Sequence, residues 1–142
     1  MYKKIGQTSE KELYVSFEDL KITRCSLLAN KKDNVKELYK DFENRLFEQF
    51  KDDLDMKYIV DGVSIKAQSE HICLINVKNS IKIHFYIEKN EEWDKDANEG
   101  KIRDISGIST GGGSVNYELT LTKDNMEDAM KLINRVYDKK MK

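Results

Sequence analysis

The chain has 142 residues, a length that fits one domain able to bury a core without disulfides or bound metal. Its 25 basic and 26 acidic residues nearly cancel, so net charge does not indicate a polyanionic partner, although local basic patches stay open. The two cysteines do not make a disulfide framework. No apolar run is long enough for a membrane span and the first residues lack a signal peptide pattern, so we expect a cytoplasmic protein.

The first 30 residues are predicted to be an N-terminal extension, and residues 31–142 a single domain. Apolar residues between positions 12 and 28 fit either an edge strand or a segment that wraps around the domain. The first 12 residues are polar and favour neither structure.

The segment 33–50 is predicted to be an amphipathic helix. Its apolar residues recur at the spacing of one helix face: Val35, Leu38, Tyr39, Phe42, Leu46 and Phe50. Asp33 or Asn34 is expected to cap its N-terminus.

Strands are predicted to follow this helix. The segment 56–68 contains two short β-runs, with Asp61-Gly62 as the turn of a hairpin. The nearly continuous apolar segment 71–77 is predicted to be a central strand, and "YELTL" at 117–121 a further strand.

The segment 81–88 alternates between apolar and polar residues, as a strand with one buried face does. Ile81, Ile83, Phe85 and Ile87 are predicted to face the core, and Lys82, His84, Tyr86 and Glu88 the opposite side. Lys82, His84 and Tyr86 form a polar stripe, which is either a solvated sheet face or an open surface that stacks or hydrogen-bonds a ligand.

The remaining segments complete the fold prediction. Residues 89–101, with the single Trp at position 93, are predicted to be an acidic loop. Residues 123–142 are predicted to contain a closing helix, with lysines at its C-terminal end. The order α-β-β-β-β-α predicts an α+β fold, an antiparallel sheet of about four to five strands with both helices packed on one face.

The stretch "RDISGISTGGGSVNYEL" at 103–119 contains three consecutive glycines, Gly111, Gly112 and Gly113. A Walker loop requires a Lys and a following helix, and both are absent from this pattern. The stretch is therefore either a flexible connection or a backbone anion nest assisted by Arg103. Arg103 and Asp104 are candidates for a structural ion pair at the base of this loop.

No catalytic, cofactor or metal site is predicted. Nuclease chemistry needs clustered carboxylates around a metal, and Asp/Glu-x-Lys triplets such as Asp55-Met56-Lys57 lack a suitable upstream acid. His71 and Cys73, at positions i and i+2, are expected to share one face of a strand, but no second ligand pair at zinc spacing accompanies them.

The block from Asn34 to Lys140 resembles an uncharacterised bacterial domain. The likeness rests on the order of "KYI" at 57–59, "ICLINVKNSIKIHFYI" at 72–87, "RDIS" at 103–106 and "YEL" at 117–119. That domain lies at the C-terminus of proteins labelled predicted transport proteins, and it follows nuclease modules in some type IV restriction-like proteins. The family loop carries His and Trp before the Tyr, whereas "STGGGSVN" does not.

The resemblance implies a non-catalytic accessory domain of bacterial nucleic-acid defence that contacts nucleic acid or a partner protein. The alternatives are a sensor of a small anionic ligand, such as phosphate or a nucleotide, and an enzyme with an unrecognised site. The sequence does not predict an oligomeric state. The candidate binding residues are Arg103, Asp104, Ser106, Gly111, Gly112, Gly113, Tyr117, Lys82, His84 and Tyr86.

Overall fold

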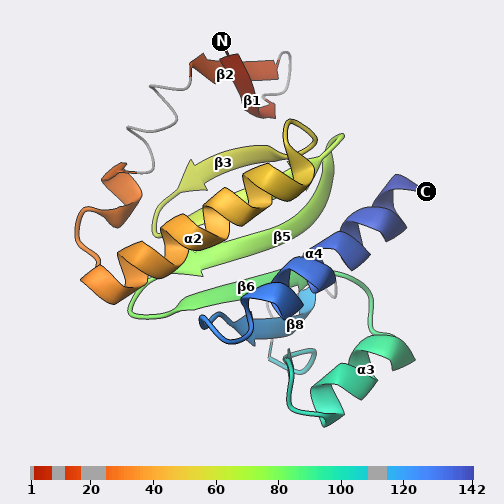
Figure 1. The fold of residues 1–142 in the computed structure, drawn as a ribbon. Coiled ribbons are helices and arrows are strands. Elements are labelled where there is room, and N and C mark those ends of the chain that lie inside the picture. Colours follow the sequence, from red (N-terminus) through yellow and green to blue (C-terminus); the bar gives the residue numbers. More distant parts are fainter. Residues whose placement is uncertain (1, 8–11, 17–24, 109–114) are drawn as a thin grey trace.

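The computed structural model describes residues 2–7, 12–16, 25–108 and 115–142. Its largest element is a 6-stranded sheet with the strand order β3-β4-β5-β6-β8-β7 (Figure 1). All neighbouring strands of this sheet run antiparallel. The strands are β3 (Asp55–Ile59), β4 (Gly62–Ala67), β5 (Glu70–Val77), β6 (Ile81–Tyr86), β7 (Arg103–Asp104) and β8 (Val115–Thr120).

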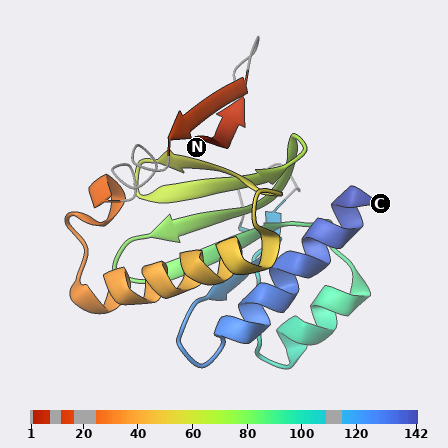
Figure 2. The same cartoon turned by 45° about the horizontal axis from the view of Figure 1, so that its top comes forward.

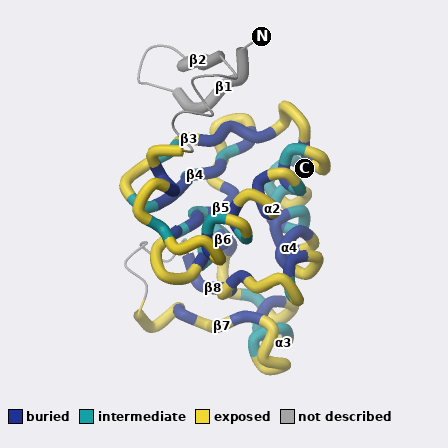
Figure 3. The backbone as a smooth tube through the Cα atoms, turned by 60° about the vertical axis from the view of Figure 1, so that its left-hand side comes forward, coloured by how far each residue is buried: buried dark blue, intermediate teal, exposed yellow. Residues whose placement is uncertain are grey.

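Helices α2 (Asp33–Phe50) and α4 (Met126–Met141) cover one face of the sheet (Figures 2 and 3). The predicted α+β architecture is therefore confirmed, with one strand more than the upper expectation because β7 adds a short one. β5 lies between β4 and β6, which confirms the predicted central strand. Among the described residues, none of the helices combines the length and apolar character needed to cross a membrane.

The core lies between this pair of helices and the sheet. Strand β6 alternates between buried and half-buried residues, as its sequence predicts, and the side chains of Ile83 and Phe85 are fully buried. They belong to one apolar cluster with Phe42 of α2 and Ile133 of α4. Transfer of such side chains out of water is the main stabilising contribution, about 1.5–3 kcal/mol for each.

The prediction of a loop over residues 89–101 is wrong, because the structure has helix α3 (Glu91–Asn98) there. The Asn90 side chain caps it by accepting a hydrogen bond of 3.0 Å from the Trp93 backbone N–H. Trp93 is the buried residue of this helix, so its apolar contact with the core comes from one large side chain rather than from an apolar stripe. The element order after β2 is therefore αββββαββα.

A β-bulge interrupts the pairing of β4 with β5. Ile65 pairs with Cys73 and Lys66 pairs with His71, so Ile72 is an extra residue on β5. Cys73 and Ile72 are both buried, whereas His71 is exposed. The prediction that His71 and Cys73 share a face is therefore wrong, because the bulge breaks the alternation between them.

The N-terminal extension contains strands β1 (Tyr2–Gln7) and β2 (Glu12–Ser16), which pair antiparallel in a separate sheet rather than at the edge of the larger one. Part of the predicted strand at 12–28 lies outside the described residues. Helix α2 starts at Asp33 after Lys32, without a side-chain capping bond, so the predicted cap by Asp33 or Asn34 is wrong.

Candidate functional site on the open face of the sheet

The sheet face opposite α2 and α4, which we call the open face, carries a row of aligned residues. Directly paired residues of antiparallel strands project to the same side of a sheet. The strand register therefore places one residue from each strand in a row on this face: Lys57, Ser64, Leu74, His84, Glu118 and Arg103.

The last three members of this row form a polar network with Asn76. The His84 Nε2 atom lies 2.8 Å from the Glu118 Oε2 atom, and the Asn76 Nδ2 atom lies 3.3 Å from the His84 Nδ1 atom. With Asn76 donating, the neutral imidazole carries its proton on Nε2 and donates it to Glu118. The Arg103 Nη1 atom lies 3.8 Å from the Glu118 Oε1 atom.

Exposure within this network differs sharply between its charged members. The Arg103 side chain is 63% exposed, whereas the Glu118 side chain is 11% exposed. Glu118 is therefore a buried anchor, already hydrogen-bonded to His84, and Arg103 presents most of its guanidinium to solvent. The guanidinium end of this ion pair is exposed and its atoms lie 3.8 Å apart, a distance longer than a hydrogen bond, so Arg103 is available to contact a ligand.

Cationic groups outnumber carboxylates on the open face. The register places these charged residues there: Lys57, Lys66, Lys82 and Arg103, with Asp55 and Glu118 as the carboxylates. Over the described part of the chain, the structure records no ion pair for the three lysines. The open face is thus locally basic, although the whole chain has a formal charge of -1.

The expected Arg103–Asp104 ion pair is wrong, because each residue has another partner. Adjacent strand residues point to opposite faces, and Asp104 turns away from Glu118 toward Lys89, whose Nζ atom lies 2.6 Å from its Oδ2 atom. Ser106 donates its N–H and its hydroxyl to the Asp104 Oδ1 atom. The bond from Lys89, and then those from Ser106, lower the pKa of Asp104 to about 2.

Tyr117 also lies away from the open face. Its ring is buried in the core, and its hydroxyl donates to Asp94 of α3 at 2.8 Å. Lys89 bridges the same Asp94 to Asp104 of β7. Tyr117 and Asp104 therefore attach α3 to the sheet edge and do not join Arg103 in a binding site.

The candidate residues thus divide into groups. Arg103, His84, Lys82 and Tyr86 all project from the open face, which brings together the stripe and the Arg predicted separately. Ser106 participates in the turn after β7. The three glycines at 111–113 lie outside the described residues, so the predicted hinge or anion nest stays a prediction.

Sequence reasoning missed the contributions of Glu118, Asn76 and His71 to this face. The polar character of Glu118 within "YELTL" was the available signal, since a charged residue in a strand with apolar neighbours marks the outward face. Which residue lies opposite Glu118 depends on the register between β6 and β8. That register includes a β-bulge between Phe85 and Tyr86, which the alternation of apolar and polar residues in the sequence does not reveal.

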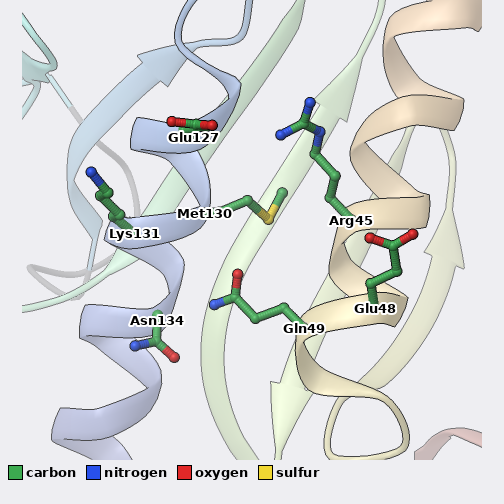
Figure 4. A pocket seen from close by; sticks show the side chains of 7 residues that line it. All are labelled: Arg45, Glu48, Gln49, Glu127, Met130, Lys131 and Asn134. Atoms are coloured by element: carbon green, nitrogen blue, oxygen red, sulfur yellow. The ribbon is translucent and has the colours of Figure 1, made fainter.

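A groove of about 460 Å³ lies on the other side of the molecule, between α2 and α4 (Figure 4). Its lining residues are Arg45, Glu48, Gln49, Glu127, Met130, Lys131 and Asn134. Cationic and anionic side chains balance there, and Arg45 is paired with Asp41 at 3.5 Å. This groove therefore has no preference for one sign of charge.

Glu43 of α2 is a carboxylate buried in the core. Its Oε2 atom accepts hydrogen bonds from the hydroxyls of Tyr39 at 2.7 Å and Tyr58 at 2.5 Å. Burial, followed by the charge of Glu43, raises the pKa of Tyr39. These bonds connect α2 to β3 inside the protein, so we assign Glu43 a structural role.

Comparison of the chain with protein-family models, with curated proteins and with solved structures finds no match. The resemblance to an uncharacterised bacterial domain therefore stays a prediction. Among the described residues, no cluster of three or more His, Cys, Asp or Glu side chains could hold a metal ion.

Proposed function

We propose that this chain is a non-catalytic binding module that binds nucleic acid through the open face of its sheet. The observation that carries the proposal is the exposed Arg103 guanidinium, held beside a face that bears Lys66 and Lys82 and that none of the described helices covers. Guanidinium and ammonium groups on one surface supply the phosphate contacts that dominate nucleic-acid affinity.

The form of the surface supports a polymer rather than a small enclosed ligand. The charged residues of the open face lie on β3, β4, β6, β8 and β7, so charged groups are spread over a platform instead of converging in a pocket. Sheet surfaces of this kind bind extended single strands in other protein classes. The sequence resemblance to an accessory domain of nucleic-acid defence supports the same ligand class.

The test is fluorescence anisotropy with a labelled single-stranded oligonucleotide over a series of salt concentrations. Arg103→Ala is expected to weaken binding about tenfold or more, because a charge-assisted hydrogen bond contributes roughly 1.5–3 kcal/mol. The substitution should leave the melting temperature nearly unchanged, because the Arg103 side chain, which forms the ion pair with Glu118, is mostly exposed to solvent. The salt slope should decrease by about 0.7 for each phosphate that the variant no longer neutralises.

Lys131→Ala is the matched control. Lys131 lies on α4 at the rim of the groove on the opposite side of the molecule, so its removal subtracts the same charge without touching the open face. Equal weakening by both variants would show a nonspecific charge effect and contradict the proposal. Competition by free phosphate or mononucleotides at low concentration would instead support the small-anion sensor. Unfolding of Arg103→Ala without a specific loss of binding would make this residue structural.

A further inference from the structure

Two aromatic rings stack on the open face near one end of the sheet. The rings of His71 on β5 and Tyr86 on β6 have centroids 4.7 Å apart and an interplanar angle of 28°. His71 is exposed and Tyr86 is half-buried, so part of the stacked pair is accessible to solvent.

A β-bulge lies on each side of the stacked pair. Ile72 is the extra residue on β5, and Asn116 is the extra residue on β8, next to the position where Tyr86 pairs with Val115. Bulges re-aim side chains and occur preferentially beside functional sites. The bulge at Ile72 has a direct effect, because regular alternation from the buried Cys73 would turn His71 toward the core instead of toward Tyr86.

The surroundings of the stacked pair combine an uncharged ring with flanking cations. Partial burial, and then the charges of Lys66 and Lys140, lower the pKa of His71, so its imidazole is neutral at neutral pH. Lys66 pairs with His71 across the strands, and Lys82 precedes Tyr86 on the same face of β6. An aromatic surface beside the Lys66 ammonium group suits a nucleobase, and Lys82, further along β6 on the same face, can contact a phosphate of the same strand.

We propose that the His71–Tyr86 pair is a stacking platform for an unpaired base, which makes the ligand of the open face single-stranded nucleic acid. The inference rests on the proposed function, since it assigns the base contact of a surface whose phosphate contacts include Arg103. Strand spacing and rise place Tyr86 about 12 Å from Arg103, across two strands and two residues. A single strand can span that distance, whereas duplex bases are already stacked and hydrogen-bonded.

The experiment compares three ligands of equal length: a labelled single-stranded oligonucleotide, its abasic counterpart with the same phosphates, and the duplex. The wild-type chain is expected to bind the base-containing single strand about 5- to 150-fold more tightly than the abasic one, the range that stacking of one base provides. Tyr86→Leu keeps an apolar side chain but removes the ring, and it should abolish this preference while leaving the salt slope unchanged. His71→Ala should reduce the preference in part.

Lys82→Gln is the charge control, and it should weaken binding of the base-containing and abasic strands by the same factor. Circular dichroism should show that all variants are folded. Equal wild-type affinity for the two strands, with a normal salt slope, would overturn the platform and leave the proposed function intact. A preference that survives in Tyr86→Leu would also overturn it. No binding of any of the three ligands would refute both proposals.

Discussion

Replacement of Trp93 by Ala should destabilise the protein strongly, although sequence patterns predict a loop at this position. Trp93 is 1% exposed. Its ring lies 5.1 Å from that of Phe85 and 5.4 Å from that of Tyr117, and the Arg135 guanidinium carbon lies 5.2 Å from its centroid. The side chain therefore connects α3 to β6, β8 and α4 at once.

The magnitude follows from these contacts. Truncation of a buried Trp to Ala costs about 3–5 kcal/mol, because apolar burial is removed and the cavity collapses only in part. Each of the two tilted ring pairs contributes roughly 0.5–1.5 kcal/mol beyond burial, so we expect Trp93→Ala to lie at the upper end of that range. Domains have about 5–15 kcal/mol of stability in total, so the substitution would remove a large fraction of the stability of the fold.

Urea unfolding monitored by far-UV circular dichroism is the suitable measurement, because the variant lacks the single Trp needed for fluorescence. At a typical slope of about 2 kcal/mol per molar urea, the midpoint should fall by about 2 M. Val60→Ala is the control, since Val60 is 92% exposed and should change stability by less than about 0.5 kcal/mol. A decrease below about 1 kcal/mol in Trp93→Ala would refute the described packing of α3.

Three further outcomes are expected. Phe85→Ala should lower the free energy of unfolding by about 3–5 kcal/mol in the same urea assay, because Phe85 is fully buried. In native protein a thiol reagent should modify the exposed Cys25 quickly, but Cys73 only on unfolding, since burial raises the pKa of its thiol. The Asp104 pKa of about 2 lies below its unfolded value, so its stabilising contribution is present above about pH 4 and is lost toward pH 2; Asp104→Asn should flatten that part of the acid unfolding profile.

The fold was largely predictable because its main elements repeat one pattern over several residues. Strand β6 alternates through its whole length, and α2 carries apolar residues on one face over 18 residues. Helix α3 was not predicted because Trp93 is the one buried residue among its 8 residues. A single buried position cannot produce the periodic pattern that identifies a helix. The Asn before an acidic turn at Glu91 was the local signal of its start.

The candidate site was predictable in part, for a different reason. Alternation alone places Lys82, His84 and Tyr86 on one face, and this was expected. The pairing of Arg103 with Glu118 instead of Asp104 depends on the register of β7 against β8, which joins residues distant in the sequence. Turn and bulge geometry sets such registers.

The extra residue at Ile72 changes how the chain should tolerate insertions and deletions. In a regular strand, the loss of one residue inverts the orientation of everything beyond it. Here Cys73 pairs with Ile65 and His71 pairs with Lys66, and Ile65 and Lys66 are adjacent on β4. Removal of Ile72 would therefore make the pairing of β4 with β5 continuous and leave the residues on both sides of the bulge with their present partners. Homologous chains could therefore differ by one residue near the start of this central strand while keeping the same inward and outward side chains.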